Sequence, residues 1–262
     1  RLFGGNRAQQ LVDAAEASVQ RGDLATAEAQ LAEALARTAD QPRWHARLGT
    51  LRHGRGDVTG ALECYRRAWA LDPTYVEMPY NIGIAEEALG HLDAAIAAYR
   101  SAIEQRPDFL EAWFNLATLC TQVDRFEDAI EAWRRVLALD PDHDEARVML
   151  ASTLQEVRRL DDAERELDVV LARRPDHPGA HLCLGLGRLA RGDLATGWAH
   201  FEWRWRTPTM ATHRRQLPVP EWNGEDPAGL VILVHHEQGF GDSLQFARFV
   251  PLLAARGARV RV

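Results

Sequence analysis

The chain contains no lysine, and all 31 of its basic residues are arginine, against 38 acidic residues. Arginine used alone can indicate phosphate recognition, but the abundance of alanine favours a GC-rich genome as the cause. The formal net charge of -7 lacks the positive excess that binding to a phosphate backbone requires. We therefore expect no general nucleic-acid binding.

Cysteine and long apolar runs are also scarce. The three cysteines, Cys64, Cys120 and Cys183, are widely separated, which is typical of buried thiols in a reducing compartment. The longest wholly apolar stretch near the end of the chain, residues 230–234, is far too short to cross a bilayer. No charged-then-apolar leader is visible at the start. The sequence predicts a cytoplasmic protein without a membrane span.

The sequence repeats itself with a fixed period. Four prolines stand 34 residues apart: Pro73, Pro107, Pro141 and Pro175. Small residues recur at the same place in each interval: Ala27, Ala61, Ala95, Ala129, Ala163 and Gly197. Bulky residues recur four positions later: Tyr65, Tyr99, Trp133, Leu167 and Phe201. Two helices cross closely only where small side chains meet and larger ones fill the grooves beside them. The period therefore predicts repeated helical hairpins.

This pattern resembles the tetratricopeptide (TPR) repeat, a helix-turn-helix unit of 34 residues. The predicted repeats are 8–41, 42–75, 76–109, 110–143, 144–177 and 178–207. A glycine marks the turn inside four of them: Gly22, Gly56, Gly90 and Gly192. The resemblance implies an all-α fold, a right-handed superhelical solenoid of about six repeats that occupies residues 1–207.

After residue 207 the sequence changes character. Residues 208–229 contain prolines with Asn-Gly and Asp-Pro pairs, which are typical of turns and linkers. The run 230–234 predicts a buried parallel strand, a helix-compatible stretch follows it, and residues 258–262 predict a second strand. One β-α-β unit cannot bury both faces of its own sheet. We therefore expect residues 230–262 to be a truncated, Rossmann-like fragment.

Two short stretches of this last segment, Glu221–Gly224 and Glu237–Phe246, bring a second resemblance. They resemble the start of the glycosyltransferase domain in bacterial TPR-containing glycosyltransferases. That domain is similar in turn to the ADP-heptose heptosyltransferases, which have two Rossmann lobes (GT-B type). The resemblance implies that Gly241 and Asp242 lie at the catalytic cleft, with the aspartate as base for the acceptor hydroxyl. It implies a nucleotide-sugar donor for the full enzyme, and no cofactor for residues 1–262 alone.

The residues themselves allow two roles for Asp242. A glycine-rich turn before a helix offers backbone N–H donors and the positive end of the helix dipole to a phosphate or an oxyanion. The candidate loop residues are Gln238, Gly239, Gly241 and Ser243. An aspartate at this turn, at the carboxyl end of a strand, could accept a proton from a hydroxyl. Aspartate also caps helices, and the sequence leaves both roles open.

The run His235-His236-Glu237 suggests a metal site at first sight. Adjacent residues of a strand point to opposite faces, and ligand pairs on helices are normally spaced by three or four residues. We expect no metal site.

The solenoid predicts a binding surface, because the first helix of each hairpin lines the inner wall. Asn81 and Asn115 occupy the position at which asparagines hold the backbone of a bound polypeptide in O-GlcNAc transferase, which this architecture resembles. A side-chain amide donates and accepts at once, so it can hold a peptide bond of any sequence. The other candidate groove residues are Arg43, Arg47, Tyr80, Phe114, Thr118 and Gln122. The alternative is a merely solvated face.

A different TPR site, the carboxylate clamp of chaperone-binding proteins, would use Arg43 and Arg47. It does not fit this sequence, because its asparagines should precede the basic pair, whereas Asn81 and Asn115 follow it.

The sequence leaves two functions open. In the first, the solenoid recruits a protein or an extended peptide for an attached glycosyltransferase domain, of which only the beginning is present. In the second, the chain is a non-catalytic scaffold for the assembly of protein complexes. Self-association is compatible with either function.

Overall fold

The computed structural model describes residues 2–38, 41–212, 217–235 and 247–262. The chain forms two compact units, Arg1–Pro175 and Asp176–Val262, and each is described by itself. The predicted linker, residues 208–229, lies inside the second unit.

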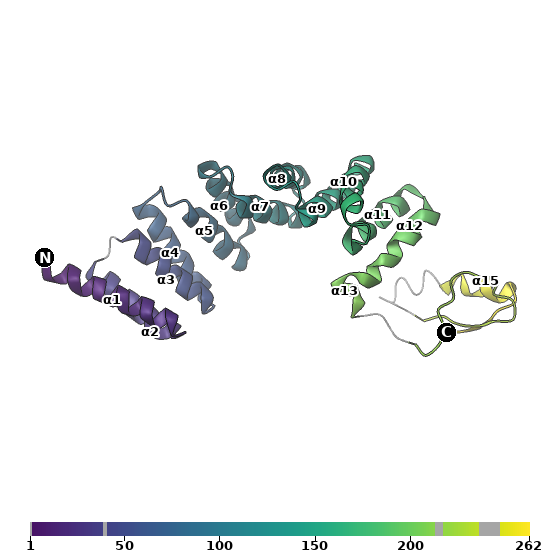
Figure 1. Ribbon diagram of the computed structural model, residues 1–262, viewed down its shortest axis with the longest axis horizontal. Coiled ribbons are helices and arrows are strands. Elements are labelled where there is room, and N and C mark those ends of the chain that lie inside the picture. Colours follow the sequence, from purple (N-terminus) through teal and green to yellow (C-terminus); the bar gives the residue numbers. More distant parts are fainter. Residues whose placement is uncertain (1, 39–40, 213–216, 236–246) are drawn as a thin grey trace. The chain divides into compact units, whose positions relative to one another are not determined.

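The first unit is a succession of five helical hairpins, in which each helix contacts the next along the chain (Figure 1). The helices are α1 (Leu2–Gln20), α2 (Leu24–Arg37), α3 (Pro42–Gly54), α4 (Val58–Leu71), α5 (Glu77–Ala88), α6 (Leu92–Gln105), α7 (Leu110–Gln122), α8 (Phe126–Leu139), α9 (Asp144–Glu156) and α10 (Leu160–Arg173). Each of the first five predicted repeats contains one such pair. The succession of helical hairpins agrees with the expected helical solenoid, and α1 begins before residue 8.

Close crossing of the two helices in each hairpin depends on small residues, as the sequence predicts. The recurring alanines of the five hairpins, Ala27, Ala61, Ala95, Ala129 and Ala163, are 0% exposed. A Cβ added at Gly83 would lie 2.5 Å from Cε1 of Tyr99, and one added at Gly49 would lie 2.6 Å from Cε1 of Tyr65. The bulky ring of each pair therefore fills the space that the glycine leaves open.

The turns between paired helices use a left-handed residue. Gly22, Gly56 and Gly90 have φ of 78°, 86° and 78°, a conformation that glycine adopts without steric cost. The fourth and fifth hairpins place Asp124 (φ 59°) and Arg158 (φ 62°) at the same point of the turn. The turn geometry is thus kept in all five hairpins, at a cost of about 1 kcal/mol for each non-glycine residue.

The second helix of four hairpins ends two residues before a repeat proline. Helices α4, α6, α8 and α10 end at Leu71, Gln105, Leu139 and Arg173. The residue that precedes each proline is extended, for example Asp140 with φ -132° and ψ 90°. A proline disfavours the helical conformation of the residue before it, so the ring fixes the helix end from outside the helix.

The second unit contains a sixth hairpin and a small sheet. Its elements are α11 (Pro178–Arg191), α12 (Leu194–Phe201), the 3₁₀ helix η1 (Glu202–Arg206), α13 (Pro208–Ala211), β1 (Val231–Leu233), α15 (Val250–Ala255) and β2 (Arg259–Arg261). Gly192 turns α11 into α12 with φ 87°. Gly185 meets the other helix so closely that an added Cβ would lie 2.6 Å from the backbone nitrogen of Phe201.

Strands β1 and β2 pair in parallel, with Val231 opposite Arg259. The order strand, helix, strand agrees with the sequence. The expectation of a fully buried strand is wrong, because Ile232 is 7% exposed while its neighbours Val231 and Leu233 are 52% and 48% exposed. A sheet of two three-residue strands is too small to bury both of its faces. These two strands alone do not establish a Rossmann-like domain.

Tyr99 packs in the core of the third hairpin, and its hydroxyl bonds the half-buried Glu87. The side chain is 0% exposed and packs beside Gly83, and its hydroxyl donates to Oε2 of Glu87 at 2.7 Å. Burial raises the pKa of the Tyr99 phenol, and the hydrogen bond to Glu87 and the charge of that carboxylate raise it further. The ring and its hydroxyl therefore tie α6 to α5.

We expect Ala95→Leu to overpack the crossing of α5 and α6, because Ala95 is 0% exposed. The free energy of unfolding should fall by roughly 1–3 kcal/mol, measured by urea denaturation. Ala94→Leu is the matched control, since Ala94 is exposed on the same helix and should tolerate the larger side chain. Equal stability of the two variants would contradict the packing of this crossing.

Stability should also depend on pH through Tyr99. The native state retains the Tyr99 proton to a higher pH than the unfolded chain, in which tyrosine ionises near about pH 10. Above that pH the native state binds more protons, so this residue makes stability fall as pH rises. Urea denaturation between about pH 8 and pH 11 should show a shallower loss for Tyr99→Phe than for wild type. Parallel profiles would show that Tyr99 does not carry the dependence.

Candidate functional site

The predicted groove residues lie on the first helices of three successive hairpins. Helix α3 carries Arg43 and Arg47, α5 carries Tyr80 and Asn81, and α7 carries the other four, Phe114, Asn115, Thr118 and Gln122. The structure brings α5 and α7 together directly, since Nδ2 of Asn115 donates to the Tyr80 hydroxyl at 3.2 Å. The centre of the candidate groove is this contact between neighbouring hairpins.

The two asparagines have different surroundings. The amide nitrogen of Asn115 donates to the Tyr80 hydroxyl and also hydrogen-bonds Tyr99, which leaves its carbonyl oxygen to accept from a ligand. Asn81 is half-buried, and its side chain makes no hydrogen bond within the described ranges. The amide atoms of Asn81 are not among the fully buried side-chain atoms that lack a partner, so they stay open to solvent and can donate to and accept from a ligand.

Aromatic rings form the wall behind these amides. The ring of Tyr80 lies 4.7 Å from that of Phe109 and 5.9 Å from that of Tyr99, measured between centroids. The guanidinium of Arg106 lies 3.5 Å from the centroid of Phe109, and its Nη1 pairs with Glu77 at 3.6 Å. This stacking is a cation–π contact.

The next hairpin repeats the same three-ring arrangement one period later in the chain. Phe114 meets Trp133 edge to face at 5.1 Å and stacks on His143 at 5.4 Å. The two sets, Tyr80 with Tyr99 and Phe109, and Phe114 with Trp133 and His143, are hereafter called the ring triads. In the fifth hairpin Val148 and Leu167 stand at the first two equivalent positions. The aromatic wall therefore belongs to the third and fourth hairpins.

Electrostatics distinguish Tyr80 from an ordinary surface phenol. Burial raises its pKa, the hydrogen bond from Asn115 lowers it, and the negative charges of Glu111 and Glu87 raise it again. Like any tyrosine, Tyr80 is protonated at neutral pH and can donate to a ligand, and its raised pKa extends this to more alkaline solution.

The remaining predicted groove residues differ in whether their polar groups are already engaged within the chain. Nη1 of Arg47 pairs with Glu16 of α1 at 3.4 Å, so this guanidinium is already engaged. Oγ1 of Thr118 donates to the Phe114 carbonyl at 2.9 Å, so this hydroxyl supports its own helix. Arg43 and Gln122 are exposed, and neither joins the contact between α5 and α7.

Sequence reasoning missed Phe109, Arg106 and His143. Phe109 and His143 close their repeats, immediately before α7 and α9, in segments that the sequence assigns to connections. The available signal was the recurrence of an aromatic or histidine ring two residues after the repeat proline, as in Tyr75, Phe109 and His143.

The predicted phosphate loop lies outside the described residues. Gln238, Gly239, Gly241, Asp242 and Ser243 all fall within residues 236–246, as do His236 and Glu237. Over the ranges that the structure covers, no group of three or more His, Cys, Asp or Glu side chains is arranged to hold a metal ion. Nor does any helix in those ranges combine the length and hydropathy of a bilayer span.

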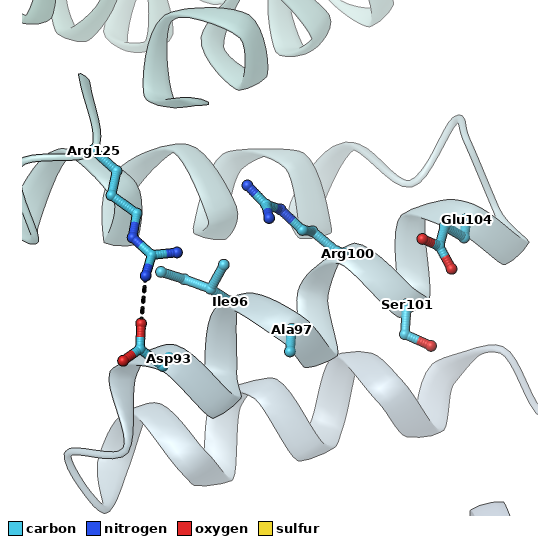
Figure 2. A pocket seen from close by; sticks show the side chains of 7 residues that line it. All are labelled: Asp93, Ile96, Ala97, Arg100, Ser101, Glu104 and Arg125. Atoms are coloured by element: carbon cyan, nitrogen blue, oxygen red, sulfur yellow. Dashed lines mark hydrogen bonds and ion pairs between the residues drawn. The ribbon is translucent and has the colours of Figure 1, made fainter. Parts of the chain in front are cut away.

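A separate depression of about 540 Å³ lies over α6, and it contains none of the predicted groove residues (Figure 2). It is lined by Asp93, Ile96, Ala97, Arg100, Ser101, Glu104 and Arg125. Figure 2 shows Arg125 directed at Asp93, and the two pair at 2.6 Å. Arg100 pairs with Asp128 at 2.8 Å. Both guanidinium groups are engaged, so the depression offers no free cation to an anionic ligand.

The cysteines carry no reactive chemistry. Cys64, Cys120 and Cys183 are all buried, and burial raises the pKa of each thiol, in Cys183 to about 12. A protonated, buried thiol is a poor nucleophile.

Known proteins share the solenoid. A solved TPR protein from Parabacteroides merdae is 20% identical and has a TM-score of 0.63, with 77% of this chain and 80% of that one covered. YrrB, described as a TPR protein with an unusual peptide-binding site, is 17% identical with a TM-score of 0.61, covering 70% of this chain and 96% of its own. MamA is 22% identical with a TM-score of 0.56, over 60% and 91% of the two chains. At these identities the likeness concerns the fold alone.

Among curated proteins, FlbA of Caulobacter vibrioides is 35% identical over 63 residues, which are 24% of this chain. The match spans only 11% of the length of FlbA. Family models described as tetratricopeptide repeat match residues 12–76, 80–144 and 122–185, which together make up more than half of the chain. They cover most of the five hairpins of the first unit and all of the predicted groove residues, and the chain belongs to the tetratricopeptide repeat family.

Proposed function

We propose that this chain is a protein-binding scaffold, and that the surface formed by α5 and α7 holds an extended polypeptide. The observation that carries the proposal is the pair of half-buried amides, Asn81 and Asn115, set against the two ring triads. The amides supply hydrogen bonds to peptide groups, and the half-buried rings of Tyr80, Phe114 and His143 supply apolar area at small entropic cost. YrrB, which has the same fold, is described as having a peptide-binding site, and this agrees with the proposal.

The polar groups at this surface offer different hydrogen-bonding capacities to a ligand. Asn81 offers both a donor and an acceptor, the carbonyl of Asn115 offers an acceptor, and the Tyr80 hydroxyl offers a donor. These groups lie on neighbouring first helices, so they can contact successive peptide units of one extended chain. These groups hydrogen-bond the backbone of the ligand and not its side chains. The amides therefore contribute affinity, and the surrounding residues contribute selectivity.

The double substitution Asn81→Ala with Asn115→Ala should weaken peptide binding by one to two orders of magnitude, because each lost amide contributes on the order of 1 kcal/mol. Linear peptides selected from a phage-displayed random library serve as ligands, and their affinity is measured by calorimetric titration. Asn81→Ala alone should leave the melting temperature nearly unchanged, whereas the double variant should melt a few degrees lower, because it also loses the hydrogen bond from Asn115 to Tyr80.

Gln105→Ala is the matched control, since it removes one exposed amide at the end of α6, on the other helix of the hairpin. It should bind as wild type does. Undiminished affinity in the double variant would overturn the groove proposal, as would a selection that yields no binders at all.

A second candidate function is recruitment of the polypeptide for an attached glycosyltransferase domain. The observation that favours it is the parallel pairing of β1 and β2, with α15 between them in the sequence. This order of strand, helix and strand is found at the start of a nucleotide-binding lobe. The scaffold function is better supported, because the tetratricopeptide repeat matches, which end at residue 185, contain the helices of the proposed groove. The candidate catalytic loop, in contrast, lies outside the described residues. A nucleotide-sugar donor belongs only to this second candidate.

The test of this second candidate is Asp242→Asn in the full-length gene product, assayed for sugar transfer. If Asp242 is the general base, turnover should fall by about two to four orders of magnitude while stability hardly changes. If Asp242 only caps a helix, turnover should stay nearly intact, since Asn caps about as well as Asp. A full-length product without any transferase activity would remove this candidate and leave the scaffold.

A further inference from the structure

The first helices of the third, fourth and fifth hairpins each carry an acidic residue at one repeated position. Glutamates stand at the same place near the start of α5, α7 and α9, one repeat apart: Glu77, Glu111 and Glu145. Glu77 is paired with Arg106 at 3.6 Å. Glu111 and Glu145 are exposed, and no basic side chain within the described ranges pairs with either of them.

Two carboxylates belong to the surroundings of Tyr80. Glu111 lies about one helical turn before Asn115 on α7, and the amide of Asn115 donates to the Tyr80 hydroxyl. Glu87 of α5 accepts from Tyr99, whose ring lies 5.9 Å from that of Tyr80, and the charges of both carboxylates act on the Tyr80 phenol. Within the described residues the contact of Glu87 is the hydrogen bond from Tyr99 at 2.7 Å, which uses one of the several lone pairs of the carboxylate. The acidic site between them therefore has spare acceptor capacity and no counter-charge of its own.

The basic side chain beside the wall is already committed elsewhere. Arg106 stacks on Phe109 at 3.5 Å and pairs with Glu77, so it is engaged with groups other than Glu87 and Glu111. Its position also demonstrates that the aromatic wall accepts a guanidinium in van der Waals contact. An arginine or lysine of a ligand would find the same kind of ring face at Tyr80, together with two uncompensated carboxylates.

We propose that the polypeptide bound in this groove is basic, and that one of its arginine or lysine side chains lies against the Tyr80 ring between Glu87 and Glu111. The inference rests on the proposed function and adds the chemical class of the partner. Charge complementarity carries it, since charge-assisted hydrogen bonds to the two carboxylates would be stronger than those between neutral groups. The formal net charge of -7 acts in the same direction by attracting basic chains from a distance. An acidic segment would meet repulsion from both carboxylates.

The test begins with the composition of the peptides selected by wild-type protein from the random library. Arginine and lysine should be enriched at one position of the aligned binders. Glu87→Gln with Glu111→Gln should bind those peptides about tenfold more weakly and lose the enrichment when the selection is repeated. The wild-type affinity should also decline as salt is raised, and the variant should respond less.

Two further variants make the result decisive. Glu131→Gln removes the same charge from an exposed site on α8 and should leave the affinity unchanged. Glu111→Gln alone changes an exposed side chain without an ion pair, so it should fold as wild type does and show part of the loss.

The outcomes also separate this inference from the function beneath it. If the asparagine variant loses affinity while the glutamate variant binds as wild type, the groove stands and the basic partner is refuted. An absence of arginine or lysine enrichment refutes it as well. If neither variant changes affinity, both the groove and the basic partner are wrong.

Discussion

The close approach of the two helices in each hairpin is the constraint on which the rest of the structure depends. It requires a small residue at the crossing, and the space beside that residue must be filled by a large one, as Gly83 and Tyr99 show. In the third and fourth hairpins the large residue is aromatic. Tyr99 and Trp133 therefore fill the hairpin cores and at the same time support Tyr80 and Phe114 in the groove. Core packing thereby positions the rings of the proposed binding surface.

The carboxylates over α6 and those on the first helices of the hairpins differ in whether they are paired. Over α6 the carboxylates are neutralised, because Asp93 pairs with Arg125 and Asp128 pairs with Arg100. On the first helices Glu111 has no such partner within the described residues. An ion pair satisfied within the chain gives a ligand little to gain, whereas an unpaired carboxylate beside an aromatic ring retains its attraction for a cation. The electrostatics thus favour the groove over the depression as the place where a partner binds.

The hairpins could be predicted well from the sequence, because each one depends on local residues at a fixed period. Small residues, turn glycines and repeat prolines all lie at the helix crossings, turns and helix ends that the 34-residue period predicts. The two C-terminal strands lie within the apolar runs that predict them. Contacts between hairpins were harder to predict. Nothing in the sequence of α3 reveals that Arg47 pairs with Glu16 of the preceding hairpin. Likewise, nothing in the sequence of α7 reveals that Asn115 reaches back to Tyr80 of α5.

The exceptions have physical reasons. Asp124 and Arg158 take the left-handed conformation although neither is glycine, because the packing of the hairpin fixes the turn and outweighs a cost of about 1 kcal/mol. The 34-residue period marks a ring at Phe109 and His143, but these residues lie in connections, so no helical pattern reveals that their rings contact Tyr80 and Phe114. The repeat position predicts Asn81 and Asn115 as groove amides, but it does not reveal that Asn115 bonds Tyr80 while Asn81 makes no side-chain hydrogen bond within the described residues.

The ring triads occupy the third and fourth of the five hairpins in the first unit. In an array where each repeat is stabilised only by its neighbours, opening begins at the ends, since a terminal repeat has a single interface to lose. Fraying of α1 and α2 leaves the triads intact. The wall is therefore built into the segment that opens least often, and its backbone amides should exchange hydrogen more slowly than those of the outermost helices.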